Sequence, residues 1–183
     1  EILPGDVATA ILGQSRTPEA VAAIRESLGL DRPAYVRYAD WLGHFIAGDI
    51  GKSLANQRDI APEIRERLGN TIFLAAVAAC ISVPLSIVLG LIAAIRQNSI
   101  FDRVVNALAL ATISFPEFFI GYLLIIVFAV NLDWFPSLAL MSDGMGFWER
   151  LDAVALPAAT LVLVVLAHMM RQTRAAVFGV LAS

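Results

Sequence analysis

Charged residues are scarce in this chain. Only 16% of its 183 residues are Asp, Glu, Lys or Arg, whereas 58% are hydrophobic, and the mean hydropathy is +0.75. A soluble domain carries about 25% charged residues, so an ordinary soluble domain is excluded. The 13 basic and 16 acidic residues form no long block of one sign, and we therefore expect no nucleic-acid partner. The class that remains is a multi-span membrane protein.

Cysteine and histidine are almost absent. The only cysteine is Cys80, so no disulfide can form within the chain. The two histidines, His44 and His168, have no companion at the spacing of metal ligands. We therefore expect no metal site made by this chain alone.

Long apolar runs are abundant. Residues 70–95 contain no charged residue and exceed the roughly 20 helical residues that cross a hydrocarbon core of about 30 Å. A second span is predicted over 104–130, with Glu117 as its only charge, and a third over 154–170. The predicted fold class is an all-α membrane protein, with a partial bundle of transmembrane helices in residues 70–183.

Residues 1–69 hold no apolar run long enough to span and are predicted to be an extracytoplasmic segment. Helix-start and helix-stop residues predict two short amphipathic helices, one between Thr17 and Gly29 and one between Pro33 and Gly48. The second has an aromatic face. These helices either lie on the bilayer surface or cap the outer mouth of the bundle, and the sequence leaves both locations open.

The first span carries small residues at spacings of three and four. Such a stripe lets a neighbouring helix approach closely. The predicted helix-packing residues are Ala75, Ala79, Ser82, Ser86 and Gly90.

Three polar residues of the second span are candidates for a translocation pathway: Glu117, Asn106 and Ser114. A carboxylate in the middle of a span costs about 2.5–3.5 kcal/mol on insertion scales, so it normally faces a bundle interior or a water-filled cavity. Asn106 lies eleven residues from Glu117, about three turns, so a continuous helix puts both on one face. Two roles stay open for Glu117: a pathway group, or a carboxyl that satisfies backbone groups freed at Pro116.

An enzymatic alternative uses Ser114 with His168 as an intramembrane serine hydrolase. No nucleophile-elbow pattern surrounds Ser114, and the two residues are predicted at different depths of their spans. The sequence favours a helix-break hydroxyl for Ser114 and an interfacial location for His168. We therefore expect no catalytic residue.

The loops predict an orientation. Residues 96–103 carry two basic residues, and so do residues 171–183, whereas 131–152 carries one basic residue against four acidic ones. The positive-inside rule puts the first two segments in the cytoplasm, and 1–69 and 131–152 outside.

Eight sequence strings, in this order and spacing, resemble the inner-membrane permease subunits of dipeptide, oligopeptide and nickel ABC importers. The resemblance covers essentially the whole chain, although such permeases often carry an acidic residue where Gly179 stands. The strings are LPGD (3–6), TPEAVAAIRESLGLDRP (17–33), YADWL (38–42), GDIGKSL (48–54), ERLGNT (66–71), SFPEFFIG (114–121), LPAATL (156–161) and RQTRAA (171–176).

The resemblance implies a six-span type I permease subunit of the bacterial inner membrane, of which this chain is the middle part. The implied partners are membrane lipid, a second permease subunit, two ATP-binding subunits and an extracytoplasmic solute-binding protein. The implied mechanism is alternating access, with peptides, glutathione or a nickel chelate among the candidate cargoes.

ATP and Mg²⁺ are then expected in the partner ATPases, with no cofactor in this chain. The string GDIGKS (48–53) ends like a phosphate-binding loop, but that motif needs glycine five residues before Gly51, where Ile46 stands. An ion channel or a structural subunit of another membrane complex is the alternative function.

Overall fold

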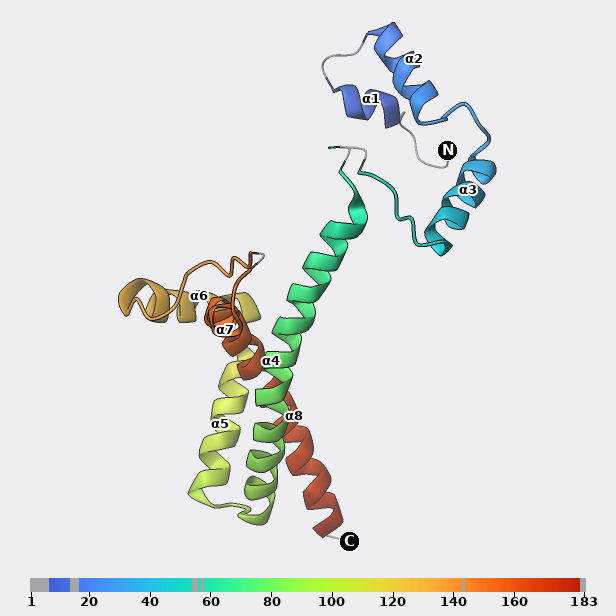
Figure 1. Ribbon diagram of the computed structural model, residues 1–183. Helices are drawn as coiled ribbons and strands as arrows, with labels where there is room; N and C mark the ends of the chain where they lie inside the picture. Colours follow the sequence, from blue (N-terminus) through green and yellow to red (C-terminus); the bar gives the residue numbers. More distant parts are fainter. Residues whose placement is uncertain (1–6, 14–16, 54–55, 57, 143, 182–183) are drawn as a thin grey trace. The chain divides into compact units, whose positions relative to one another are not determined.

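The computed structural model describes residues 7–13, 17–53, 56, 58–142 and 144–181, which form two compact units divided after Leu68. Within the described residues every element longer than a bridge is helical, and one isolated bridge pairs Lys52 with Asp59 (Figure 1). The all-α class predicted from the sequence is confirmed. The LPGD string lies outside the described residues. In chain order the elements are α1 (Val7–Leu12), α2 (Pro18–Ser27), α3 (Ala34–Ile46), α4 (Ile60–Ile95), α5 (Ile100–Ser114), α6 (Glu117–Leu124), the π-helix η1 (Ile125–Asn131), α7 (Phe147–Ala153) and α8 (Ala155–Leu181).

The two short helices expected in the first unit are present as α2 and α3. The Thr17 hydroxyl accepts a hydrogen bond from the Ala20 N–H at 3.2 Å and caps α2, with Pro18 as its first residue. Gly29 and Gly48 follow the two helices with φ of +59° and +92°, a conformation that glycine adopts without steric cost. Helix α1 was not predicted.

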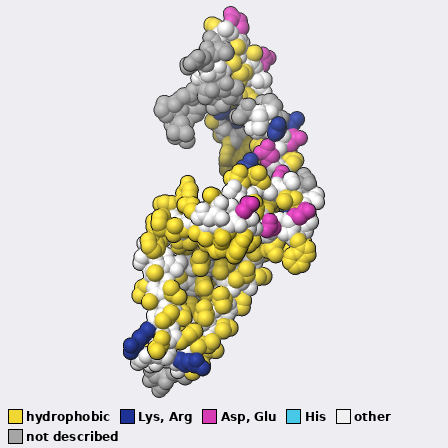
Figure 2. All heavy atoms as spheres, turned by 90° about the vertical axis from the view of Figure 1, so that its left-hand side faces the viewer, with side chains coloured by type: hydrophobic (Ala, Val, Ile, Leu, Met, Phe, Trp, Pro, Cys, Tyr) yellow, Lys and Arg dark blue, Asp and Glu magenta, His cyan; other side chains and the backbone are white. Residues whose placement is uncertain are grey.

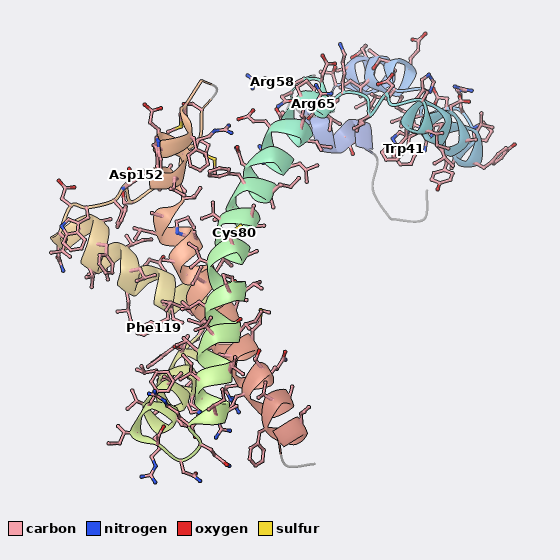
Figure 3. The ribbon with its side chains drawn as sticks, turned by 60° about the horizontal axis from the view of Figure 1, so that its bottom comes forward. Trp41, Arg58, Arg65, Cys80, Phe119 and Asp152 are labelled. Carbon is pink, nitrogen blue, oxygen red and sulfur yellow. The ribbon has the colours of Figure 1, made fainter. Side chains whose placement is uncertain are left out.

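The aromatic face of α3 is exposed within its own unit. Trp41 stacks on Phe45, with ring centroids 5.3 Å apart, and lies 5.9 Å from Tyr38. Trp41, labelled in Figure 3, keeps half of its surface accessible. Its location, on the bilayer surface or over the bundle mouth, stays a prediction.

The first predicted span belongs to a longer helix. Helix α4 begins at Ile60, ten residues before the predicted start at 70, and continues to Ile95. The added turns carry charges, which kept them out of the apolar run, but they hold good helix formers, and Glu63 and Arg67 are paired four residues apart at 4.0 Å.

The second predicted span, 104–130, is broken. Helix α5 ends at Ser114, α6 begins at Glu117, and the two parts of the pair are bent by 104°. Pro116 has no N–H to continue α5 and disfavours a helical conformation in the residue before it. Phe115 accordingly adopts the extended φ and ψ of −97° and 141°.

The third predicted span, 154–170, continues as α8 to Leu181 and therefore includes Arg171 and Arg174. Among the described residues two helices, α4 and α8, are long and apolar enough to cross a membrane. The bent pair of α5 with α6 and η1 makes a third if it is counted as one span.

Helix α8 is the centre of the second unit, since α5, α6 and α7 all pack on it. Ala109 of α5 and Ala167 and Met170 of α8 form a buried cluster. Apolar side chains cover the visible face of this unit, with basic side chains gathered at its lower end (Figure 2). Such a surface suits a helical bundle in lipid.

Candidate functional site

Glu117 lines an open pocket of about 510 Å³ in the second unit. This volume lies within the range of roughly 300–1,000 Å³ typical of small-molecule sites. Among the described residues that line it, Glu117 is the only charged one, and its side chain is exposed. The lining residues come from α4, α6, the segment after η1, and α8: Leu74, Glu117, Phe118, Gly121, Ile125, Pro136, Ser137, Ala139, Leu156, Pro157, Thr160 and Leu161.

The break at Pro116 determines where Glu117 lies. The Pro116 carbonyl accepts hydrogen bonds from the N–H groups of Phe119 and Ile120, at 3.0 and 3.3 Å, and so begins α6 at Glu117. Phe119, labelled in Figure 3, stacks on Phe115 across the break with ring centroids 5.3 Å apart. The carboxyl is therefore held at the start of a new helix, where the dipole favours a negative charge.

Gly121 of α6 lines the pocket opposite Thr160 of α8. A Cβ at Gly121 would lie 3.6 Å from Thr160 Oγ1, an ordinary van der Waals contact, so the two helices are neighbours at this level. The Thr160 hydroxyl donates to the Leu156 carbonyl at 2.9 Å. Its oxygen keeps a lone pair that can accept from a ligand.

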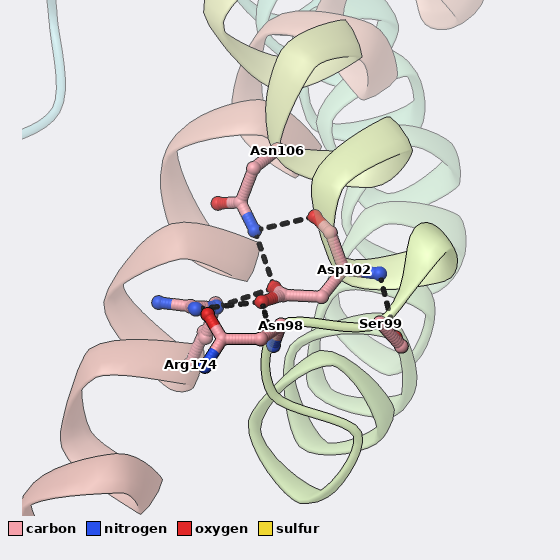
Figure 4. A network of polar contacts seen from close by, with 5 residues as sticks. All are labelled: Asn98, Ser99, Asp102, Asn106 and Arg174. Carbon is pink, nitrogen blue, oxygen red and sulfur yellow. Dashed lines mark hydrogen bonds and ion pairs between the residues drawn. The ribbon is translucent and has the colours of Figure 1, made fainter.

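A polar network lies at the other end of α5 (Figure 4). Arg174 of α8 pairs with Asp102 of α5 through two bonds, Nε to Oδ1 at 2.7 Å and Nη2 to Oδ2 at 2.8 Å. Asp102 is only 4% exposed. Its carboxylate also accepts from Asn106 Nδ2 at 2.7 Å and from the Asn98 N–H at 3.1 Å, and its own N–H donates to Ser99 Oγ at 3.2 Å.

The predicted shared face of Asn106 and Glu117 is corrected by the structure. The 104° bend lies between the two residues, so they do not belong to one continuous helix. Asn106 donates to Asp102 and lines a different groove of about 420 Å³, together with His168 and Arg171. The structure brings Asn106 to the ion pair and not to Glu117.

Ser114 and His168 are each engaged with their own helix. The Ser114 hydroxyl donates to the Leu110 carbonyl at 2.7 Å, and His168 Nδ1 lies 3.0 Å from the Val164 carbonyl. This bonding fits the helix-break role for Ser114. It offers no support for a serine hydrolase.

The predicted packing stripe of α4 is partly displaced. Ser82, Ser86 and Gly90 are buried, whereas Ala75 and Ala79 are exposed. The buried face repeats every four residues, and the next buried residue toward the start of α4 is therefore Ala78. At Gly90 an added Cβ would lie 2.7 Å from Thr173 Cβ and 2.8 Å from the Met170 carbonyl. Helix α8 therefore contacts α4 where only glycine fits.

No three metal-ligating side chains of His, Cys, Asp or Glu lie together in the part of the chain that the structure describes. The sequence missed the Asp102–Arg174 pair, since 72 residues separate its partners. One signal in the sequence could have indicated this pair. Charged side chains such as those of Asp102 and Arg174 are costly in lipid, so each one near the end of a span is expected to have a partner.

Comparison with known proteins is consistent along the chain. Residues 1–75 match the family described as binding-protein-dependent transport system membrane component, N-terminal. A Brucella abortus (strain 2308) protein named as a peptide transport system permease is 38% identical over 99% of this chain and 58% of its own length. The glutathione transport system permease proteins GsiC of Escherichia coli O6:H1 and Salmonella choleraesuis are 36% and 34% identical over 98% of this chain and 56% of theirs. The chain thus spans a little over half the length of these relatives.

Proposed function

We propose, on the premise that this chain is a relative of the permease proteins of binding-protein-dependent transport systems, that it forms part of the translocation pathway of an ABC importer. The chain is a multi-pass helical protein of the bacterial inner membrane. The observation that carries the proposal is the continuous similarity to permeases over 98–99% of its residues.

The proposed mechanism is alternating access. A second permease subunit completes the pathway, two ATP-binding subunits hydrolyse ATP with Mg²⁺, and an extracytoplasmic solute-binding protein delivers the cargo. This chain contributes helices and performs no chemistry of its own. A protein that moves a solute by changing conformation binds it differently in its two states, and the binding energy of ATP supplies that bias.

The broken span supports a pathway. Backbone without helical bonds is tolerated at membrane depth only where protein covers it or where it lines a water-filled cavity. Phe115, at the break, is 52% exposed, and Glu117 and Phe118, which follow it closely in the chain, line the pocket. The break and the pocket together favour a pathway role for Glu117 over backbone repair alone.

The proposed cargo is a peptide or a related small solute. The relatives from Brucella and from the enteric bacteria are named for peptide and for glutathione transport, respectively. Glutathione is itself a peptide, and both names therefore favour this class over a nickel chelate. An ion channel and a purely structural subunit are the alternatives.

Uptake in cells tests the proposal. A strain that lacks the gene for the complete subunit should no longer accumulate labelled dipeptides, tripeptides or glutathione. A copy of the gene on a plasmid should restore this accumulation. Unchanged uptake of all three, with an altered resting ion conductance, would assign the chain to a channel.

A further inference from the structure

The polar side chains that line the pocket beside Glu117 offer mainly hydrogen-bond acceptors. Glu117 supplies two carboxyl oxygens, and no other charged residue in the described part of the chain lines the pocket. The Thr160 hydroxyl has already donated its hydrogen to the Leu156 carbonyl, so only its oxygen is left to accept. Ser137, the other hydroxyl of the lining, can donate or accept. The ligand group that complements these acceptors is a positively charged hydrogen-bond donor.

The rest of the pocket is apolar. Leu74, Phe118, Ile125, Leu156 and Leu161 line the same pocket, from α4, α6, η1 and α8. Such walls offer no partner to a second charged group, whose burial against them would cost free energy. The complementary ligand has one cationic donor group joined to an apolar body.

We propose that this pocket binds the protonated amino group of an amphipathic solute, such as the N-terminal ammonium of a short peptide with an apolar side chain, through Glu117 and Thr160. The proposal deepens the proposed function, since it assigns the end of the cargo that enters this site. The cargo's carboxylate then lies outside the pocket, because none of the described lining residues carries a positive charge that could pair with it.

Two other sources could supply an ammonium group: the headgroup of phosphatidylethanolamine, and a lysine of a neighbouring helix. A transported solute is favoured, because the volume of about 510 Å³ and the apolar walls match a small-molecule site. The experiment distinguishes the three sources.

The test measures photolabelling of the complete, assembled transport complex in vesicles. The probes are a dipeptide of benzoylphenylalanine and alanine with a free amino terminus, and its N-acetyl derivative. Labelling should map to segments that line the pocket, and the free amine should label at least about tenfold more at equal concentration, which corresponds to about 1.4 kcal/mol. Equal labelling by the two probes overturns the proposal.

Variants assign the preference to the carboxyl. Glu117→Gln should abolish the stronger labelling by the free amine, and Glu117→Asp should keep it. If Glu117→Gln does not assemble, Glu117→Asp still tests the proposal. Asp133→Asn is the matched control, because Asp133 is an exposed carboxyl outside the pocket and its φ of +50° suits asparagine. Gly121→Val, which fills the pocket, should lower labelling by both probes. A preference that persists in Glu117→Gln overturns the assignment.

The same assay separates the sources. Replacing phosphatidylethanolamine by phosphatidylglycerol in the vesicles should leave the preference for the free amine unchanged. If the preference is seen only after that replacement, the phosphatidylethanolamine headgroup had occupied the pocket, and the site is assigned to the lipid. Assembly that is lost in both Glu117→Gln and Glu117→Asp assigns it to a neighbouring helix. If labelling depends on Glu117 while the complex transports no peptide, the proposed function fails and the binding site stands.

Discussion

Arg174 and Asp102 form a bidentate ion pair that joins α8 to the first turn of α5 across 72 residues of sequence. Four hydrogen bonds converge on the Asp102 carboxylate, and one of them comes from the Asn98 N–H in the turn between α4 and α5. Residues 170 and 173 of α8 contact Gly90 of α4 at nearly the same level. Three helices are therefore held together at one end of the second unit.

Breaking this pair should destabilise the complete subunit. Removing Asp102 leaves Arg174 without its partner, and because the Arg174 side chain is 27% exposed the cost should lie below the roughly 3–5 kcal/mol of a fully buried pair. Asp102→Ala should therefore lower the midpoint of thermal unfolding in detergent, and Arg174→Met with Asp102→Leu should recover part of the loss. Arg171→Met, which changes an exposed arginine of the same helix, is the control and should change little. If Asp102→Ala unfolds at the same temperature as wild type, the pair has no structural role.

Close approach at Gly90 gives a second prediction. Gly90→Leu puts side-chain atoms where Thr173 and the Met170 carbonyl already lie, so α8 must move away from α4. The recovery of intact complex by size-exclusion chromatography should fall severalfold. Gly69→Leu is the matched control in the same helix, because a Cβ there meets nothing within 4 Å. Equal recovery of the two variants would show that the contact is dispensable.

Pro116 is predicted to be the cause of the break. Pro116→Ala restores an N–H and removes the ring that opposes a helical Phe115, so the 104° bend should open toward a continuous helix. Spin labels at Ala107 and Leu123 should then report a longer separation, and transport should fall while assembly is kept. An unchanged distance would mean that packing on α8, and not proline, imposes the bend.

The predicted orientation can be tested by cysteine labelling after Cys80 is replaced by alanine. Ser142→Cys should react with a membrane-impermeant maleimide from outside, and Gln97→Cys should react only after the membrane is opened, because the basic loop 96–103 is expected in the cytoplasm. Gln97 is preferred to its neighbour Asn98, whose φ of +61° disfavours cysteine. The reverse pattern of labelling would contradict the orientation.

Local signals predicted local structure well. The cap at Thr17 and the glycines after α2 and α3 act within a few residues, and the structure contains both helices where those signals predict them. The start of α4 at Ile60 was missed because charged turns do not register in an apolar run, although they can be helical.

What depends on tertiary contact could not be predicted. Hydropathy treats 104–130 as one apolar run, so the bend at Pro116 and the separation of Asn106 from Glu117 were not visible. The ion pair of Asp102 with Arg174 joins residues that the sequence placed in different cytoplasmic segments. The face of α4 that is buried depends on where α8 lies, and a stripe of small residues leaves more than one choice.

The central claim is that this chain belongs to a subunit through which an importer moves its solute. Its most direct test is uptake of a labelled dipeptide or glutathione into vesicles that contain the complete subunit, its permease partner, the ATP-binding subunits and the binding protein. We predict that uptake requires ATP on the side of the membrane that carries the ATP-binding subunits. Uptake should stop when this subunit is omitted, and it should proceed without an ion conductance. Solute movement that is unchanged without ATP, or a conductance in place of uptake, would contradict the account.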